Sequence, residues 1–420
     1  MGTLLFFNQP EQGHINPTLP LVAELVRRGE KVIYYSLEDF QGAIEQTGAT
    51  FRSYGEAYPF DPKQVDENQF TLLLRYLQVS QHVLGQLLPQ IRAERPNALL
   101  YDQLCVWGQY LAQLLNVPAI CSMPMFIITP HMILRDPAQI HNRLVSGKLI
   151  RDIRSVAAKI SATYGVRKVS LFELANNPGQ LNIVYTSKYF QPNGNAFDET
   201  YQFVGSSLLP RADAPPFPYE ALDRDKPLIY ISLGTQFNAQ PEFYRRALAA
   251  FAQSRYQVVL SVGRKTPISS LGTIPSHVIV RHSVPQLDIL QRAALFITHG
   301  GMNSVSEAFS YGVPLLVIPQ SADQPWVARR VAQLGAGKML HQADVYPHKI
   351  RRLAEEILAN PSYSQASARI GETLRQAGGY LRAADEIQRF LGHTFHYAPR
   401  APRSWGEVLF NALTSWTSPL

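Results

Sequence analysis

Two series of short apolar segments, each alternating with stretches of helical spacing, limit what this chain can fold into. Strands that alternate with helices form parallel sheets with helices on both faces. We therefore expect an α/β protein with two doubly wound sheets. The first series of predicted strands is Thr3–Phe7, Lys31–Ser36, Ala98–Tyr101, Ala119–Ser122 and Leu181–Thr186. The second series is Leu228–Leu233, Val258–Val262, Val278–Val280, Leu295–Thr298 and Leu315–Ile318.

A stretch rich in proline and charge, Leu209–Lys226, separates the two series and predicts a linker. A chain of 420 residues is long for one core and suits two domains of roughly 200 residues each. We expect an N-terminal domain at residues 1–208 and a second domain at 227–375, followed by a helix within 376–394. The last predicted helices are Pro347–Ala359, Ser364–Gln376 and Tyr380–Leu391.

The charge and the cysteines exclude some classes of protein. The net charge is +7, but the arginines are dispersed and no basic run with stacking aromatics occurs, so nucleic acid is not an expected partner. General basicity instead suits an enzyme that attracts an anionic substrate. Cys105 and Cys121 lie in apolar surroundings and are predicted to be buried free thiols, not a disulfide framework.

Both ends of the chain bear on its location. The N-terminus lacks a basic segment followed by an apolar core, and no run of 18 apolar residues occurs, so we expect a cytoplasmic protein. In the tail, residues 395–420, five apolar positions recur at helical spacing and predict an amphipathic helix. They are Trp405, Val408, Leu409, Leu413 and Trp416. Such a helix can dock on the body, join two protomers or touch a membrane surface, and we favour docking.

The segment His299-Gly300-Gly301 links a predicted strand to a predicted helix. The glycines let a ligand approach the backbone, and Asn303 or Ser304 can cap the helix. The free N–H groups and the positive helix end attract phosphate. The alternative is an ordinary strand-to-helix turn, which for the glycines alone would be the better interpretation.

Three further polar residues follow in the same region. Glu307, one turn into the helix, can accept hydrogen bonds from ribose hydroxyls, because a carboxylate only accepts and a vicinal diol offers two donors. Asp323 and Gln324, after the strand near Ile318, can do the same for a hexose. The alternative for Glu307 is a solvated helix carboxylate.

A candidate catalytic pair lies in the first half of the chain. His14 follows the first predicted strand, in a loop that ends with Asn16 as helix N-cap and Pro17 as first helical residue. Ligands of open parallel sheets bind at this edge, and imidazole can take a proton near neutral pH. Asp102 ends another predicted strand at the same edge and can orient the imidazole. A histidine or aspartate of this kind without context is more often structural.

The chain lacks the signatures of other nucleotide sites. The loop after the first strand has a single glycine, and no phosphate-loop lysine motif occurs, so NAD and ATP sites are not expected. Asp223-Arg224-Asp225 imitates a metal-binding aspartate pair but falls in the predicted linker, where a charge cluster is the better interpretation. The helix end and neutral donors can stabilise a diphosphate, so no metal and no cofactor are expected.

Several motifs together resemble the inverting family 1 glycosyltransferases, especially their bacterial macrolide and antibiotic branch. Besides the block from Ser283 to Gln324, they are Gln12-Gly13-His14-Ile15-Asn16-Pro17, Arg27-Arg28-Gly29, Ser232-Leu233-Gly234-Thr235 and Leu334-Gly335-Ala336-Gly337. The resemblance covers nearly the whole chain, up to the neighbourhood of Phe390, and the motifs are specific in combination.

The resemblance implies a GT-B arrangement, with two Rossmann-like domains that face each other across a cleft and a last helix that returns to the first domain. It implies that His14 and Asp102 are the catalytic dyad. It also implies a donor site for a UDP-sugar, a co-substrate and not a cofactor. Its expected residues are Ser232, Thr235, His299, Gly300, Gly301, Asn303 and Ser304 around the diphosphate, Val284, Gln286 and Glu307 for base and ribose, and Asp323 and Gln324 for the sugar.

One position departs from the family pattern. Many relatives carry an aromatic residue that stacks on uracil where this chain has Ser283. Either Arg281, His282 or another side chain covers the base, or the base is held loosely, so thymidine and guanosine donors remain alternatives.

The acceptor pocket is expected near Met123, Met125 and Phe126, where unbranched methionines tolerate varied apolar shapes; the alternative is core filler. The predicted function is therefore metal-independent, inverting transfer of a sugar, with glucose favoured, to a hydroxyl of an apolar small molecule such as a macrolide, polyphenol, terpenoid or carotenoid. The alternatives are a non-catalytic nucleotide-sugar-binding protein and a sugar-nucleotide epimerase of the same fold.

Overall fold

The computed structural model describes residues 2–61, 69–129, 132, 147–208, 215–236 and 238–394. The chain divides into two compact units. The first comprises Met1–Ser207 and the chain from Ala377 onward, and the second comprises Leu208–Gln376. The predicted tail helix and part of the predicted linker lie outside the described residues.

The first unit is built on a parallel sheet in the order β3-β2-β1-β4-β5-β6-β7. All its strand pairs are parallel, and the central strands are almost wholly buried. The strands are β1 Thr3–Phe7, β2 Lys31–Ser36, β3 Thr50–Ser53, β4 Ala98–Asp102, β5 Ala119–Met123, β6 Leu181–Val184 and β7 Tyr201–Phe203.

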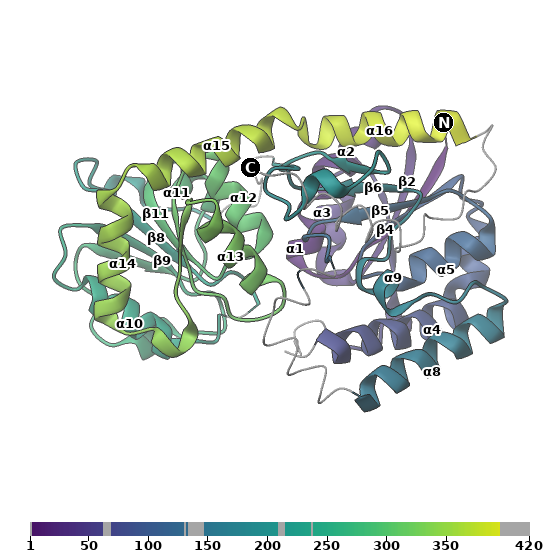
Figure 1. Ribbon diagram of the computed structural model, residues 1–420, viewed down its shortest axis with the longest axis horizontal. Helices are drawn as coiled ribbons and strands as arrows, with labels where there is room; N and C mark the ends of the chain where they lie inside the picture. The colour runs from purple at the N-terminus through teal and green to yellow at the C-terminus, as the bar shows by residue number, and fades with distance from the viewer. Residues whose placement is uncertain are drawn as a thin grey trace, which may run out of the picture. The chain divides into compact units, whose positions relative to one another are not determined.

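Helices cover both faces of this sheet (Figure 1). On one face, α4, α5 and α8 form an apolar core that includes Leu77, Trp107 and Ile153. On the other face, α2 and α16 contribute Leu21 and Ile387. The helices are α1 Gln12–Ile15, α2 Leu19–Arg27, α3 Gln41–Glu45, α4 Gln69–Ala93, α5 Val106–Leu115, α8 Gly147–Tyr164, α9 Leu171–Asn176 and α16 Gly379–Thr394.

The return of α16 to the first unit rests on Arg28. Its guanidinium donates to Asp385 Oδ1 at 2.6 Å and to Gln388 Oε1 at 3.1 Å. Glu24 holds the other side of the guanidinium at 2.6 Å. Hydrogen bonds from Arg27 and Arg28 lower the pKa of Glu24 to about 2. Of the Arg27-Arg28-Gly29 motif, Arg28 therefore makes the hydrogen bonds to α16, beside the apolar contact of the two helices.

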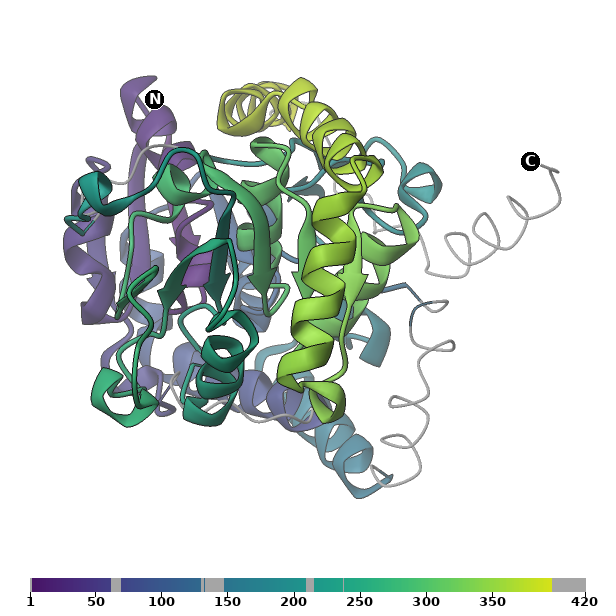
Figure 2. The ribbon, with the colours of Figure 1, turned by 90° about the vertical axis from the view of Figure 1, so that its left-hand side faces the viewer.

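The second unit repeats the plan with six strands in the order β10-β9-β8-β11-β12-β13, again all parallel. Turning the molecule brings these green strands and their flanking helices toward the viewer (Figure 2). The strands are β8 Leu228–Ser232, β9 Gln257–Ser261, β10 Val278–Arg281, β11 Ala293–Thr298, β12 Leu315–Val317 and β13 Gly337–Met339.

Helices α10 and α14 close one face of this sheet through a core that includes Tyr244, Phe251 and Ile350. Elsewhere in the unit α12 packs against α15, and Gly371 on α15 lies so close to Phe309 that an added Cβ would be 1.9 Å from its carbonyl oxygen. The helices are α10 Pro241–Phe251, α11 Gln286–Leu290, α12 Met302–Ser310, α13 Gln324–Gln333, α14 Pro347–Ala359 and α15 Ser362–Gln376.

The prediction of two doubly wound parallel sheets is confirmed, and two local predictions were wrong. Three strands, β3, β7 and β13, were not expected. The helix after β1 does not begin at Pro17: the chain first makes the short helix α1, and α2 then begins at Leu19 with Thr18 as N-cap. The Thr18 hydroxyl donates to the Ile15 carbonyl at 2.8 Å, which joins the two helices.

Both sheets share the strand order 3-2-1-4-5-6 for their first six strands, counted within each unit. The direction of winding reverses between β1 and β4 in the first unit and between β8 and β11 in the second. Ligands of open parallel sheets bind outside the carboxyl ends of the strands at such a reversal. Each unit therefore has one place where a ligand site is expected. No helix among the described residues is both long enough and apolar enough to cross a membrane.

Candidate active site

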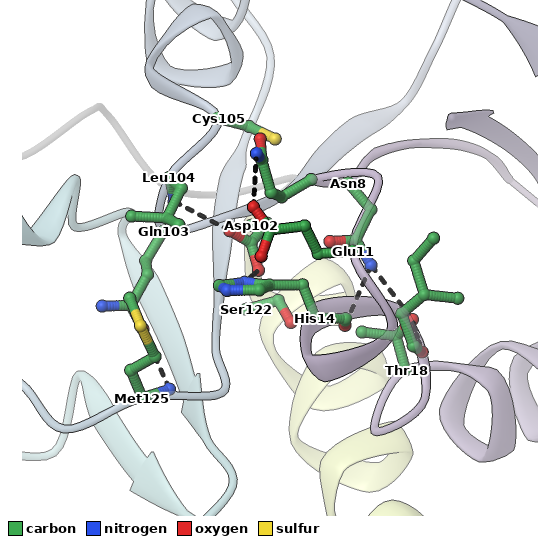
Figure 3. A network of polar contacts seen from close by, with 12 residues as sticks. Asn8, Glu11, His14, Thr18, Asp102, Gln103, Leu104, Cys105, Ser122 and Met125 are labelled. Atoms are coloured by element: carbon green, nitrogen blue, oxygen red, sulfur yellow. Dashed lines mark hydrogen bonds and ion pairs between the residues drawn. The ribbon is translucent and has the colours of Figure 1, made fainter. Parts of the chain in front are cut away.

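In the first unit, the reversal point brings His14 and Asp102 together. His14 lies on α1, directly after β1, and Asp102 is the last residue of β4. His14 Nδ1 is 2.7 Å from Asp102 Oδ2 (Figure 3). The imidazole is 7% exposed and the carboxylate 0%. The other carboxylate oxygen accepts from the Leu104 N–H at 2.8 Å, so both oxygens of Asp102 are directed by the fold.

Asn8 fixes the short helix that carries His14. Its amide nitrogen donates to the His14 carbonyl at 3.2 Å and lies 3.2 Å from the Thr18 hydroxyl and 2.5 Å from the Tyr34 hydroxyl. Figure 3 shows Asn8 between His14 and Thr18. Asn8 is fully buried, so these hydrogen bonds are shielded from solvent. Asn8 could not be predicted from the sequence, because an asparagine after a strand has no distinctive spacing.

A buried aromatic cluster braces the segment before α1. The Tyr54 hydroxyl donates to the Asn8 carbonyl at 3.1 Å, and Gln9 Nε2 donates to the Tyr58 hydroxyl at 2.8 Å. Trp107 on α5 packs edge-on against Tyr54, with ring centroids 5.6 Å apart. Because α5 follows Asp102 in the chain, this cluster links the segment that holds the carboxylate to the segment that holds the imidazole.

The three predicted acceptor residues have different environments. Met123 at the end of β5 and Phe126 are each 1% exposed, and Phe126 packs against Phe190 with ring centroids 5.2 Å apart. Met125 is half-buried, and its N–H donates to Gln103 Oε1 at 3.3 Å. Met125 is thus the member of the three with a partly exposed side chain.

In the second unit, the predicted donor residues follow adjacent strands. Ser232 ends β8, His299 follows β11, and the Pro319–Gln324 segment follows β12. Since these strands are neighbours in a parallel sheet, their loops meet at one edge. An added Cβ on Gly300 would be 3.5 Å from the Gln324 carbonyl oxygen, so the second and third loops are in contact.

His299 fits between two glycines. A Cβ added to Gly234 would lie 2.6 Å from the His299 imidazole, and a Cβ added to Gly301 would lie 2.5 Å from it. Neither position tolerates a side chain unless the ring moves. Burial lowers the pKa of His299 to about 4, although a hydrogen bond with the Ser232 backbone opposes the shift. The imidazole is therefore neutral at pH 7 and has a single N–H, which donates to the Ser232 backbone.

Helix α12 begins next to His299. Its N-cap is Gly301 and its first residue is Met302, so the prediction that Asn303 or Ser304 caps it was wrong. Among the residues that the structure describes, no side chain caps this end. The extended backbone of Gly301 already starts the helix, and its carbonyl accepts the first bond from Val305 at 3.0 Å. Asn303 and Ser304 consequently lie in the first turn, where the N–H groups and the helix dipole favour an anion.

Glu307 is a buried carboxylate with defined partners. It is 2% exposed, and Gln286 Nε2 donates to its Oε2 at 2.5 Å. The same amide nitrogen lies 3.3 Å from the Ser304 hydroxyl, and the Tyr230 hydroxyl donates to Gln286 Oε1 at 2.9 Å. Gln286 and Glu307, predicted for the same nucleoside, are thus brought together. Tyr230 was not predicted as a site residue, because it lies within the continuous apolar run of β8, which predicts only a buried strand.

Gln324 and Asp323 begin α13 in different ways. Gln324 is buried, and its Oε1 accepts from the backbone N–H groups of Gln320 at 2.8 Å and Ser321 at 3.2 Å. Asp323 is the N-cap residue and is half-buried. Between them and the strand, Ala322 adopts a left-handed backbone with φ of 57°, which a non-glycine residue rarely does. The amide oxygen of Gln324 therefore organises the loop that carries Asp323.

The segment predicted to hold the base is mostly exposed. Arg281, His282 and Ser283 are exposed, while Val284 is 8% exposed. His282 Nδ1 lies 2.8 Å from the Gly263 carbonyl oxygen, which fixes the position of an exposed imidazole beside Ser283.

The remaining polar candidates have structural surroundings. Cys105 and Cys121 are buried free thiols, as predicted, and burial raises the pKa of both. Asp223 in the linker pairs with Lys226 at 2.9 Å. Over the described residues, no group of three or more His, Cys, Asp and Glu side chains is arranged to hold a metal ion.

Known proteins match the chain in sequence. Residues 245–377 match the family model for the C-terminal domain of erythromycin biosynthesis protein CIII-like proteins. The chain is 35% identical to the NDP-glycosyltransferase YjiC of Bacillus licheniformis, over 92% of this chain and 97% of that protein. It is 30% identical to the demethyllactenocin mycarosyltransferase of Streptomyces fradiae, over 93% of this chain and 87% of that protein.

A solved structure extends the match to the fold. The calicheamicin glycosyltransferase CalG4 superposes with a TM-score of 0.80 at 30% identity, over 95% of this chain and all of that chain. The GT-B fold class expected from the motifs is thereby confirmed. Identity of 30% or more over most of the chain goes with a shared activity class, so this protein is an enzyme that transfers glycosyl groups. It belongs to the family 1 glycosyltransferases, in their macrolide and antibiotic branch.

Proposed function

We propose that this glycosyltransferase moves glucose from UDP-glucose to a hydroxyl group of an apolar small molecule, with inversion at the anomeric carbon and without a metal ion. The single observation that carries the proposal is the contact of 2.7 Å between His14 and Asp102 at the reversal point of the first sheet. A general base whose imidazole is oriented by a buried carboxylate suits removal of a proton from a hydroxyl.

The proposed reaction is a single displacement. The acceptor oxygen attacks the anomeric carbon while its proton passes to Nε2 of His14, since Nδ1 faces Asp102. The bond from the anomeric carbon to the diphosphate oxygen breaks, and its electron pair leaves with UDP. Attack opposite to the leaving group inverts the anomeric configuration. The Asp102 carboxylate stabilises the imidazolium that forms, and the proton is then lost to solvent.

The donor is assigned to the second unit. The first turn of α12, next to His299, offers N–H donors to the departing diphosphate, which supports a reaction without metal. Glu307, with Gln286 beside it, is a suitable acceptor for the ribose hydroxyls. Most of the net positive charge of the sequence falls in residues 208–376, which favours attraction of an anionic donor.

The choice of glucose and of an apolar acceptor is supported less directly. The relatives named above differ in sugar, since one is a mycarosyltransferase, so the family alone does not fix the sugar. Glucose is favoured because Asp323-Gln324 matches the pair usual for it. The calicheamicin and demethyllactenocin transferases act on natural products, which favours an acceptor of that type here.

A donor-by-acceptor screen tests the proposal. The purified protein is incubated with UDP-, TDP- or GDP-glucose and a panel of hydroxylated macrolides, polyphenols, terpenoids and carotenoids, and products are detected by mass spectrometry. We expect a β-glucoside from UDP-glucose that forms equally well with a chelator present. An α-linked product would contradict inversion, and loss of turnover on chelation would contradict the metal-free mechanism. Conversion of UDP-glucose without an acceptor, followed by NMR, would instead identify an epimerase.

A further inference from the structure

Asn238 joins the loops that follow three neighbouring strands of the second sheet. Its amide nitrogen donates to the carbonyl oxygens of Gly234 at 2.9 Å and Thr235 at 3.0 Å, in the loop after β8. Its own carbonyl accepts from the Thr266 hydroxyl at 2.5 Å, in the loop after β9. Asn238 is 3% exposed, so these bonds are shielded from water.

Gly263 connects Asn238 to the third loop. An added Cβ at Gly263 would lie 2.2 Å from the Asn238 amide, so the side chain rests directly on this glycine. The Gly263 N–H donates to the His282 carbonyl at 2.9 Å, and His282 Nδ1 lies 2.8 Å from the Gly263 carbonyl oxygen. Asn238 therefore contacts the loop after β9, which is itself hydrogen-bonded to the loop after β10. Its side chain donates to the loop after β8.

The orientation of the amide group follows from its partners. Both contacts of the side chain are backbone carbonyl oxygens, which only accept hydrogen bonds. The amide nitrogen, and not the amide oxygen, must face them. A peptide unit is planar and trans, so its C=O and N–H point in opposite directions. Since the Gly234 carbonyl is drawn toward Asn238, the Thr235 N–H is turned to the opposite side.

We propose that Asn238 is a positioning residue for the donor diphosphate: it holds the Gly234–Thr235 peptide so that its N–H side, and not its carbonyl, faces the anion. This inference rests on the proposed donor site of the second unit. Gly234 lies against the His299 imidazole, which places the peptide beside that site. If the peptide turned over, a carbonyl oxygen would replace an N–H donor, and the anion would be repelled.

The test compares Asn238→Ala and Asn238→Asp with the wild-type protein. Asp keeps the shape but cannot donate to the two carbonyls, and Ala removes the donors without adding charge. Binding of UDP, TDP and GDP is measured by calorimetry, and the steady-state constants for donor and acceptor are measured separately. We expect nucleotide binding and the donor KM to weaken by about 10- to 100-fold in both variants, the range for a hydrogen bond to a charged group, with the acceptor KM unchanged.

A matched control exists in the first unit. Asn182 on β6 is also buried, and its amide nitrogen also donates to two carbonyl oxygens, of Gly179 at 3.3 Å and Thr200 at 3.2 Å. Asn182→Ala should lower the melting temperature about as much as Asn238→Ala but leave nucleotide binding unchanged. A purely structural role for Asn238 would make the two variants alike in both measurements.

Each remaining outcome decides the matter. If Asn238→Ala bound the nucleotides as tightly as the wild type, the positioning role would be overturned. The same holds if only Asn238→Asp lost nucleotide affinity, because that loss would come from the added negative charge alone. Wild-type protein that binds none of the three nucleotides would overturn the proposed donor site as well. If Asn238→Ala does not fold, Thr266→Val removes the bond to the Asn238 backbone, and it should weaken UDP binding by about 2- to 10-fold; unchanged binding would again overturn the role.

Discussion

The two units share a strand order but carry different chemistry at the point where the winding reverses. In the first, a histidine follows the first strand and meets a carboxylate from the fourth. In the second, a histidine follows the strand in the fourth position and meets two glycines and an uncapped helix end. The fold sets where a ligand binds, and the side chains set what happens to it.

The two histidines show this difference most clearly. A carboxylate beside His14 favours the charged imidazolium, which a general base becomes during its reaction. At His299 burial is the main influence, and it lowers the pKa to about 4. The first imidazole is thus suited to gain a proton and the second to remain neutral while it donates a hydrogen bond.

The largest effect is expected at His14. His14→Ala removes a proton transfer that contributes about 100- to 10,000-fold to rate, so kcat should fall by that range. Nucleotide affinity should stay at the wild-type value, because the donor is assigned to the other unit. Steady-state kinetics and UDP calorimetry measure the two quantities. Undiminished kcat would remove His14 from the mechanism.

Asp102→Asn sharpens the same result. The amide keeps the shape of the carboxylate but cannot stabilise an imidazolium, so kcat should fall while nucleotide binding holds. An effect of this variant on nucleotide affinity alone would reverse the assignment of roles to the two units.

The next effect concerns pH and His299. Because the folded state holds the neutral imidazole, the unfolded chain binds more protons between pH 6.5 and about 4. The stability from this group is fully present above pH 6.5 and is lost as the pH falls through about 4. The shift corresponds to an upper value of about 3 kcal/mol. Urea unfolding at pH 7.5 and 4.5 should therefore show a smaller loss of stability in His299→Gln than in the wild type.

Both the wild type and His299→Gln contain His14, so any contribution of His14 to the pH dependence of stability is the same in the two proteins and drops out of their difference. Equal losses of stability on acidification in the two proteins would mean that His299 titrates normally, and the contrast between the two histidines would fail.

A smaller effect is expected at Glu307, on the donor side alone. Glu307→Ala removes the proposed acceptor for the ribose hydroxyls and leaves the Gln286 amide without its carboxylate partner. The donor KM should rise by about 10- to 100-fold with the acceptor KM unchanged. Glu242→Ala is the control, because Glu242 on α10 is an exposed carboxylate of the same unit that pairs with Arg246. An effect of Glu307→Ala on the acceptor KM would show that the ribose is not bound there.

The sequence predicted the strands that are buried on both faces and missed three of the four strands at the sheet edges. The fourth edge strand, β10, was predicted because it contains the apolar run Val278–Val280. β1 and β2 have the predicted bounds, because each is a continuous apolar run. β3, β7 and β13 are edge strands, short and partly exposed, and none forms such a run. The helix starts after β1 and β11 were misplaced because backbone geometry, not a capping side chain, determines them.

The candidate site divides in the same way. The convergence of His14 with Asp102 could be predicted, since residues at the carboxyl ends of neighbouring parallel strands must meet. The contact of Gln286 with Glu307 follows only from the family resemblance, because these residues come after β10 and β11, which are separated by two strands. The residues that hold these groups, such as Asn8 and Asn238, could not. Their side chains donate to backbone carbonyls inside the segments that follow the strands, 6 residues away for Asn8 and 4 residues away for Asn238, and such contacts leave no periodic signal in the sequence.

The smallest predicted effect tests the aromatic support of the catalytic base. Tyr58→Phe keeps the ring against Trp107 but removes the hydroxyl that accepts from Gln9 at 2.8 Å. Gln9 also donates to Glu11, whose carbonyl accepts from the His14 N–H at 2.9 Å, so the change reaches the base through two bonds. A lost neutral hydrogen bond is worth about 1 kcal/mol, so kcat should fall by roughly 2- to 10-fold. Steady-state kinetics should show no change in the donor KM.

Tyr110→Phe provides the control for that variant. Tyr110 on α5 is also fully buried in the first unit, but its hydroxyl has no hydrogen-bond partner among the described residues. Removing an unsatisfied buried hydroxyl should leave kcat unchanged and hold or raise the melting temperature. If Tyr58→Phe and Tyr110→Phe behaved alike, the hydroxyl of Tyr58 would have no part in holding the base. The His14–Asp102 contact would then depend mainly on Asn8 and the Leu104 N–H, and Asn8→Ala should show the larger loss of kcat.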